Sequence, residues 1–323
     1  MPILLRRWLC LVLTLAAALA VGAGAQGRST SRALWVWDAT PLLQDVSARH
    51  RFLEFSRARG IDIAWLQVSR SPGGNRLRQE DAWRELLHDA HRSGIKIHAL
   101  DGDPAYVLRE RHYVVLELVD TIIRFNREAP PDQRFDGIHL DNEPHELAGW
   151  QLPVIRERLL AEYLELNARV QRIVRAEGGL EYGVDIPFWW QYRDDQTGAA
   201  IGDVMFEGVR KAVSFHVLDL VDNVGIMDYR NVAGGDDGII AHARDLLAYA
   251  NGTQAKVFIG VETSPVAPGA LPKLTFDGRS NAEMERELAL AQAAFTGHRS
   301  YAGFAIHHYM PYRERFRSDD GSR

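Results

Sequence analysis

The sequence predicts an α/β fold, a single (β/α)8 TIM barrel, from three observations. Eight short runs rich in β-branched and aromatic residues recur along the chain, helical patterns fill the intervals, and no Pro/Gly/Ser-rich linker divides the series. An open sheet with added strands is the alternative, but the regular alternation favours a closed barrel.

The eight strand-like runs set the order of the expected elements. They are ALWVWD from Ala33, IDIAWLQVS from Ile61, IKIHALD from Ile95, FDGIHLD from Phe135, LEYGVDIPF from Leu180, VDNVGIMDY from Val221, KVFIGVE from Lys256 and YAGFAIHHY from Tyr301. Helical patterns between them include Ala82 to Gly94 and Ile155 to Gly179, and both end at glycine, as helices often do.

The first residues predict a signal peptide over 1–25. Arg6 and Arg7 precede an apolar run from Trp8 to about Val21, and the small residues of 23–25 are typical of a cleavage site. We expect cleavage after Ala25 and a secreted or periplasmic protein without a membrane anchor. The barrel domain would then cover 26–323, with short flexible termini.

Composition excludes several chemistries. Cys10 is the only cysteine and lies in the leader, so the mature chain would have no disulfide and no cysteine nucleophile. Loss of the two leader arginines moves the formal charge from -5 to about -7 and leaves no basic tract for nucleic acid. No glycine-rich phosphate loop follows a strand, so we expect no cofactor. The sequence leaves the oligomeric state open.

Polar and aromatic residues gather where the predicted strands end, which is where such barrels build their sites. The candidate substrate-binding residues are Trp37, Asp38, Gln67, Asp101, His139, Asn142, Asp185, Trp189, Trp190, Asp228, Arg230, His308 and Tyr309. The aromatic rings would stack on sugar C–H faces or fill the core. Trp189 and Trp190 are adjacent and face opposite ways, so at least one should be exposed.

The run FDGIHLDNEPHE, residues 135–146, carries the strongest signal. His139, Asp141 and Glu143 alternate with Ile138, Leu140 and Asn142, so the period of two turns the first three toward one face. Buried charges must be bonded to one another or used on a ligand. A satisfied buried network is one interpretation. The other is a general acid, Glu143, supported by Asp141, because two close carboxyls cannot both ionise easily.

Glu262 ends an apolar strand elsewhere in the predicted barrel and could be an exposed strand-end residue. It also supplies the second carboxylate that glycoside hydrolysis requires.

With these residues, the chain resembles (β/α)8 glycoside hydrolases of clan A. Asn142-Glu143-Pro144 is similar to the Asn-Glu-Pro that ends strand four there, and Glu262 ends strand seven. The resemblance implies a retaining enzyme with Glu143 as acid/base and Glu262 as nucleophile, acting on a poly- or oligosaccharide. His307-His308-Tyr309 stands where that clan has a Trp.

The same stretch also resembles the DGxDxDxE motif of chitinase-like family 18 enzymes. Asp136, Gly137, Asp141 and Glu143 match, and Met227 with Tyr229 is similar to that family's MxY motif. This resemblance implies that the substrate's N-acetyl group is the nucleophile, oriented by Asp141 and hydrogen-bonded by Tyr229. His139 replaces the middle Asp, and Arg230 stands where an acid usually follows the Tyr. Of the two, the clan A interpretation is preferred, because Glu262 ends strand seven and the family 18 motif is incomplete.

Two other classes remain open. A metal-dependent hydrolase could draw ligands from His98, Asp101, Asp103, His139, Asp141, His307 and His308. It would lack a His-x-His pair on strand one, where Trp35-Val36-Trp37-Asp38 stands, and we expect no metal. A sugar-binding barrel without catalysis is the other class.

Overall fold

The computed structural model describes residues 30–71, 73, 75–193, 198 and 200–319. The predicted leader and its cleavage site lie outside these residues. In the described part of the chain, no helix combines the length and the apolar character needed to span a bilayer.

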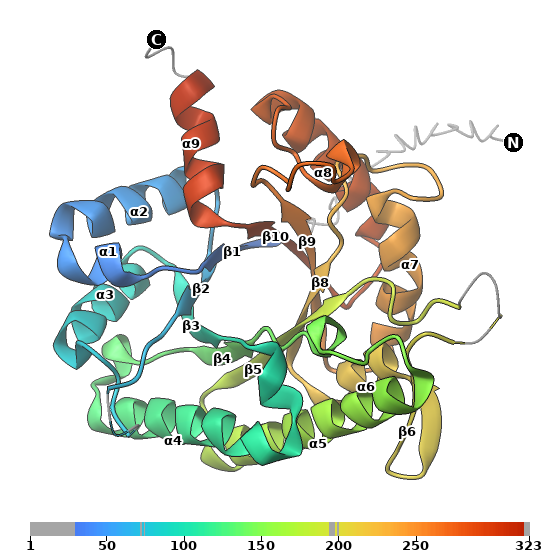
Figure 1. Cartoon of the computed structure of the whole chain (residues 1–323). Helices are drawn as coiled ribbons and strands as arrows, with labels where there is room; N and C mark the ends of the chain where they lie inside the picture. The colour runs from blue at the N-terminus through green and yellow to red at the C-terminus, as the bar shows by residue number, and fades with distance from the viewer. Residues whose placement is uncertain (1–29, 72, 74, 194–197, 199, 320–323) are drawn as a thin grey trace, which may run out of the picture.

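Eight parallel strands close into one barrel, as the sequence predicts (Figure 1). In chain order they are β1 (Ser31–Val36), β2 (Ile63–Gln67), β3 (Lys96–Asp101), β4 (Gly137–Leu140), β5 (Glu181–Pro187), β8 (Asn223–Met227), β9 (Lys256–Glu262) and β10 (Tyr301–His307). Their order around the barrel is β1-β10-β9-β8-β5-β4-β3-β2, and the pair Leu34 and Ile306 is part of the closure. All eight predicted runs therefore form strands of the same sheet.

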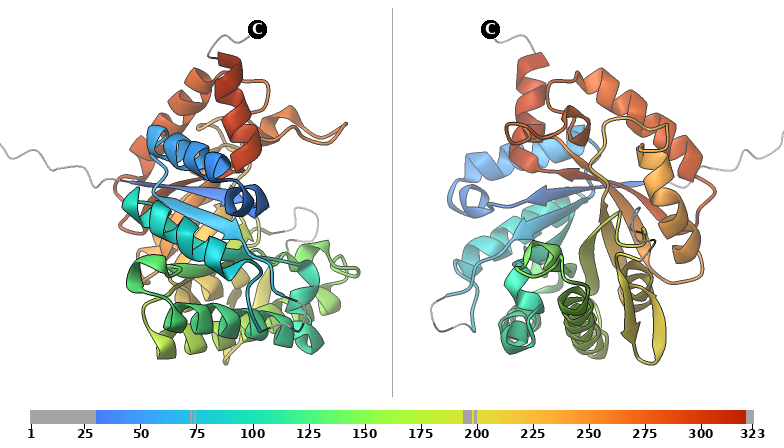
Figure 2. Two further views of the ribbon diagram at one scale, coloured as in Figure 1. Left: turned by 90° about the vertical axis from the view of Figure 1, so that its left-hand side faces the viewer. Right: turned by 45° about the vertical axis from the view of Figure 1, so that its right-hand side comes forward.

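Helices surround the barrel in the described chain (Figures 1 and 2). They are α1 (Thr40–Gln44), α2 (Val46–Ala58), α3 (Glu80–Arg92), α4 (His112–Glu128), α5 (Pro153–Glu177), α6 (Val213–Leu220), α7 (Ile239–Ala250), α8 (Asn281–Phe295) and α9 (Tyr309–Asp319). Short 3-10 turns are η1 (Pro104–Val107), η2 (Arg109–Arg111), η3 (Pro131–Gln133), η4 (Pro144–Glu146) and η5 (Pro272–Leu274). Helix α8 begins with a capping box, in which Ser280 and Glu283 bond each other's backbone N–H.

A β-hairpin between β5 and α6 is the element that the sequence prediction missed. Strands β6 (Asp203–Phe206) and β7 (Val209–Ala212) pair antiparallel, and in Figure 1 the hairpin lies at the edge of the molecule beside α5. Its two turn residues, Glu207 and Gly208, both have positive φ, at 47° and 81°. A turn of this kind usually has Asn or Asp before its Gly, so Glu207 gave little signal.

The core lies in two layers that follow the period of two. Leu34 and Val36 pack outward into the large cluster between sheet and helices, whereas Ala33 and Trp35 belong to the cluster inside the barrel. There Trp35 meets Trp65 edge to face at 4.5 Å between ring centroids. Strands buried on both faces explain the nearly continuous apolar runs in the sequence.

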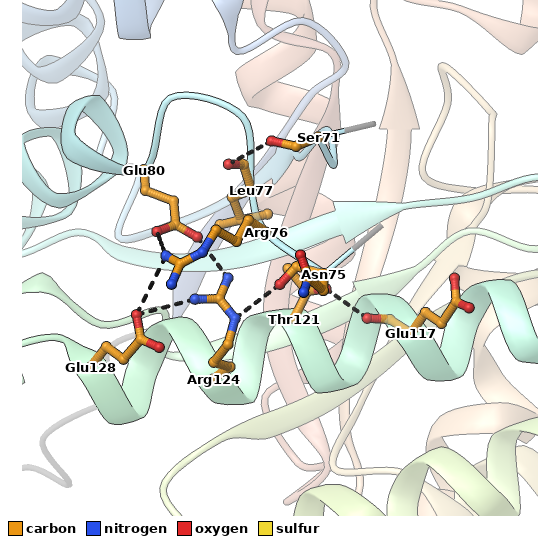
Figure 3. Close-up of polar contacts among 9 residues, drawn as sticks. All are labelled: Ser71, Asn75, Arg76, Leu77, Glu80, Glu117, Thr121, Arg124 and Glu128. Carbon is orange, nitrogen blue, oxygen red and sulfur yellow. Dashed lines mark hydrogen bonds and ion pairs between the residues drawn. The ribbon is translucent and has the colours of Figure 1, made fainter. Parts of the chain in front are cut away.

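The loop after β2 is held to α4 by an arginine and glutamate network (Figure 3). The Arg124 guanidinium donates to Glu80 at 2.6 Å and to the Asn75 carbonyl at 2.9 Å. Arg76 donates to the same Glu80 side chain at 2.8 Å and lies 3.6 Å from Glu128. The network thus ties the loop after β2 and the start of α3 to α4.

Candidate active site

The floor of the site is a buried histidine and aspartate pair between two tryptophans. On β4, Ile138 and Leu140 pack outward, and His139 points inward and stacks on Trp65 at 3.8 Å. His139 Nε2 lies 2.8 Å from Asp185 Oδ1. From β1, the Trp35 indole N–H donates to Asp185 Oδ2 at 2.9 Å.

Glycines on neighbouring strands provide the space for these side chains. A Cβ at Gly183 would collide with the Asn223 side chain and His139, and one at Gly225 would collide with the Asp185 carboxyl. At Gly260 it would lie 3.0 Å from the Trp35 ring. The side chains of His139, Asp185 and Trp35 therefore occupy space that these glycines on β5, β8 and β9 leave open.

Burial keeps the floor pair free of net charge. It lowers the pKa of His139 to about 3 and raises the pKa of Asp185 well above its usual range. The charge of Glu143 adds to the rise at Asp185, against the hydrogen bond from Trp35. Burial thus disfavours the charged form of each group in the floor beneath the rest of the site.

Asp141 and Glu143 lie above this floor. Burial first, and then the charges of Asp185 and Glu143, raise the pKa of Asp141 well above 3.8. Asp141 Oδ1 is buried and has no hydrogen-bond partner in the described part of the chain. Glu143 is 31% exposed, and its Oε2 lies 3.0 Å from His145 Nε2. A buried carboxyl that resists ionisation thus lies beside an accessible one, an arrangement suited to proton transfer.

His145 is held by aromatic rings. The rings of Trp150, Trp189 and Trp190 meet it nearly edge-on at 6.0, 5.2 and 6.0 Å. Trp190 is fully buried and Trp189 is half-buried, and both rings contact His145, so they do not face opposite ways and neither is fully exposed. These three rings therefore fix the position of the His145 imidazole, which contacts Glu143.

Glu262, at the end of β9, has a different environment. Its Oε1 accepts the backbone N–H groups of Thr263 and Ser264 at 2.7 and 2.6 Å, and its Oε2 lies 2.7 Å from His307 Nδ1. Burial raises its pKa, but the hydrogen bonds from His307 and Ser264 outweigh this, so the pKa is lowered overall. The Trp37 indole N–H donates to His307 Nε2 at 2.8 Å.

Tyr229, just after β8, lies close enough to both Glu262 and the Asp141 and Glu143 pair to feel their charges. Its ring centroid is 5.7 Å from that of His307. Burial raises the pKa of its hydroxyl well above 10, and the charges of Asp141, Glu262, Asp185 and Glu143 add to the rise. It therefore stays a neutral hydrogen-bond donor.

Several residues predicted to contact substrate are not accessible in the structure, and for that role the prediction is wrong. His139 and Asp185 form the floor, and Trp190 backs His145. Asn142 is 1% exposed and accepts the Asp103 N–H at 3.3 Å. Tyr309 is buried at the start of α9 and packs edge-on against Phe52.

Asp228 is also buried, because the chain turns outward after β8. Its Oδ1 lies 2.7 Å from His242 Nδ1 on α7. Burial raises the pKa of Asp228 to about 6, against the hydrogen bond to His242. Asp228 is therefore part of the packing of α7 and not of the mouth.

The remaining predicted residues lie at the rim. Asp38 is exposed and accepts the Thr40 N–H at 2.9 Å at the start of α1. The Arg230 guanidinium donates to Asp237 at 2.8 Å. Gln67, Asp101 and His308 are half-buried; burial raises the pKa of Asp101 and lowers that of His308.

The sequence prediction missed Trp65 and His145 as residues of the site. Trp35 and His307 lie at predicted strand ends, but they were not included among the substrate-binding or catalytic residues, and His307 was named only as a possible metal ligand. The period of two could have found His307, because Ala305 faces the barrel interior and His307 follows two residues later. His145 follows a strand end on a 3-10 turn, where no such period applies.

The ligand set proposed for a metal enzyme does not converge. Within the described residues, the one group of three potential ligands is Glu143, His145 and Glu146, whose ligand atoms lie within 4.8 Å of one another. It contains none of the seven residues named for that alternative.

These features define a closed (β/α)8 barrel with clustered carboxyls at the carboxyl ends of its strands. No family model matches the chain, and no curated protein matches it. Among solved structures it is similar to a family 18 glycoside hydrolase, a chitinase from Pseudoalteromonas aurantia, at 12% identity and a TM-score of 0.56 over 91% of this chain and all of that one.

Two other solved structures match at similar levels. A chitinase from Bacteroides thetaiotaomicron has 14% identity and a TM-score of 0.54, over 87% of this chain and 90% of that one. A spore cortex-lytic enzyme from Bacillus cereus has 11% identity and a TM-score of 0.54, over 90% and 74%. The predicted resemblance to (β/α)8 glycoside hydrolases is thus confirmed at the level of the fold.

Proposed function

We propose that this protein is a glycoside hydrolase that cleaves polymers of 2-acetamido sugars by substrate-assisted catalysis. The observation that carries the proposal is the pair at the end of β4, in which Asp141, whose Oδ1 is buried and has no hydrogen-bond partner among the described residues, lies beside the accessible Glu143. The fold is shared with chitinases, and a chitinase from Cycas revoluta with this fold was solved in complex with (GlcNAc)3, at 11% identity and a TM-score of 0.51 over 85% of this chain and 94% of that one.

In this mechanism Glu143 protonates the glycosidic oxygen as the bond to the anomeric carbon breaks. The substrate's acetamido oxygen attacks that carbon and forms a cyclic intermediate, so the protein supplies no nucleophile. Asp141 accepts a hydrogen bond from the acetamido N–H, whose nitrogen becomes positive, and the Tyr229 hydroxyl donates to the acetamido oxygen. A water molecule, deprotonated by the Glu143 carboxylate, then attacks the anomeric carbon and breaks its bond to the acetamido oxygen. The proton from this water restores Glu143 as the acid.

The environment of Glu262 favours this route over a double displacement. A nucleophilic carboxylate must bring an oxygen within about 3–3.5 Å of the anomeric carbon. Glu262 already shares its charge among three N–H groups, which weakens it as a nucleophile. The clan A interpretation, with Glu262 attacking, remains the rival that the test addresses.

The test compares two matched polymers, one N-acetylated and one de-acetylated, with the wild type and Glu143→Gln. Release of reducing ends only from the acetylated polymer, lost in the variant, is the expected result. Equal cleavage of both polymers would contradict substrate assistance. No release from either polymer would favour a sugar-binding barrel.

We also propose that the chain is exported, on the strength of the basic and apolar leader before Ala25. Amino-terminal sequencing of the protein recovered from outside the cytoplasm should begin at Gln26, and an intact leader there would contradict cleavage.

A further inference from the structure

A hydrogen-bonded chain joins Glu262 to Trp37 through His307. It runs from the carboxylate Oε2 to His307 Nδ1 at 2.7 Å, and from His307 Nε2 to the Trp37 indole nitrogen at 2.8 Å. The three residues come from the ends of β9, β10 and β1, which are neighbours in the barrel.

The chemistry of tryptophan fixes the direction of this chain. An indole N–H only donates, so His307 Nε2 must accept with its lone pair. In the neutral imidazole the proton then lies on Nδ1, from which it donates to Glu262 Oε2. Each polar atom of the chain therefore has one definite role.

The carboxylate end of the chain is itself immobilised. Glu262 and His307 are paired in register across β9 and β10. The Thr263 N–H and hydroxyl both donate to the His307 carbonyl at 2.7 Å. The Glu262 side chain is 13% exposed and that of His307 is 20% exposed, so both lie mostly behind the surface.

Trp37 is the exposed end of this assembly. Its half-buried ring packs against the cluster inside the barrel and meets His307 at 6.3 Å between centroids. In the strand order, β10 lies opposite β4, so Trp37 and His307 are across the mouth from Glu143. Aromatic rings in such a place stack on the apolar faces of sugar rings.

We propose that Glu262 and His307 are positioning residues, which hold the Trp37 ring as the stacking platform for a sugar unit of the substrate. This inference rests on the proposed function and assigns Glu262 a role other than nucleophile. Trp37 is the residue that contacts substrate, and the pair acts through it.

The test separates affinity from turnover. Trp37→Ala, His307→Phe and Glu262→Gln should each raise KM for an N-acetylated oligosaccharide about tenfold, with kcat changed much less. Glu262→Gln should have this effect despite its shape. If the Gln amide oxygen accepts from His307, its NH2 group is placed against the Thr263 and Ser264 N–H groups. In the reverse orientation the NH2 group is placed against the His307 Nδ1–H, so in either case two donors oppose each other.

Thr275→Val is the matched control. The Thr275 hydroxyl donates to the Ser264 carbonyl at 2.7 Å and to the Glu262 carbonyl at 3.3 Å, so its bonds go to backbone groups and not to the side chains that lead to Trp37. The control should lose some thermal stability but keep the wild-type KM. In a Glu143→Gln background, Glu262→Gln should also weaken binding of the same oligosaccharide about tenfold, measured by calorimetry.

Two results would overturn the inference while leaving a glycosidase in place. One is a loss of kcat by orders of magnitude in Glu262→Ala that azide restores, as a nucleophile requires. The other is an unchanged KM in Trp37→Ala. Failure of the proposed function is a separate outcome, because the wild type would then cleave no acetylated substrate at all.

Discussion

Two carboxyl groups at the same barrel mouth have opposite environments. Asp141 has a buried oxygen without a partner, and burial with neighbouring charges raises its pKa. Glu262 receives three N–H bonds, and its pKa is lowered in spite of burial. Both follow strand ends, so position in the fold does not distinguish them.

The difference indicates how each group can act. A carboxyl that has one oxygen without a hydrogen bond, and whose surroundings raise its pKa, can exchange a proton or bond a ligand at little cost. A carboxylate whose bonds are already made instead fixes the groups around it. We therefore infer that proton transfer occurs on the β4 side and substrate placement on the β9 and β10 side.

The largest expected effect tests the β4 side. Glu143→Gln should lower kcat by about 10²–10⁴ on substrates with poor leaving groups, because no other group protonates the leaving oxygen. Steady-state kinetics should show a smaller loss on an aryl glycoside with an acidic leaving group. Glu146→Gln, at the exposed neighbouring acid, is the control. A near-wild-type rate on the poor leaving group would contradict the acid assignment.

The next effect tests the partner of that acid. Asp141→Asn should lower kcat/KM by about 10²-fold, the lower end of the range for acid–base groups. The raised pKa of Asp141 keeps a proton in the cluster as pH rises, so the alkaline limb of the profile should move to lower pH in the variant. Asp103→Asn, at an exposed cap, should keep the wild-type limb. An unshifted limb in Asp141→Asn would count against the coupling.

Asp228 has a raised pKa although it lies outside the mouth, so the effect of its titration should be on stability. The folded pKa of Asp228, about 6, exceeds the ordinary value of 3.8 for an aspartate, so its contribution to stability is complete below 3.8 and is lost as pH rises through 6. That contribution should fall by about 2 kcal/mol between pH 4 and 6. Denaturant unfolding at several pH values should show a flatter profile in Asp228→Asn. Parallel profiles would contradict the raised pKa.

The smallest expected effect tests the tie between β9 and β10. Thr263→Val removes the hydroxyl bond to the His307 carbonyl, which keeps its bond from the Thr263 N–H. The free energy of unfolding should fall by about 1 kcal/mol, as for a typical hydrogen bond. Urea denaturation measures it. A loss above about 3 kcal/mol would show that the strand ends depend on this bond more than we infer.

The sequence could predict the barrel and the inward face of β4, because both depend on periodicity. Ile138 and Leu140 pack outward and His139 inward, as a period of two requires. Beyond the last ladder bond that period no longer applies. Asp228 therefore turns toward α7, and Asn142 toward the loop after β3. The bonding of Glu262 could not be predicted, since it depends on which strands become neighbours.

The glycines of the barrel wall constrain how this sequence can vary. Gly225 and Asp185 occupy one space between them, as do Gly183, Asn223 and His139. A larger residue at either glycine can be accommodated only after the facing side chain has become smaller, so the two changes must come in that order. Among homologues, residue size at 183 should vary inversely with residue size at 139 and 223, and residue size at 225 with that at 185, a covariation between positions that need not share any chemistry.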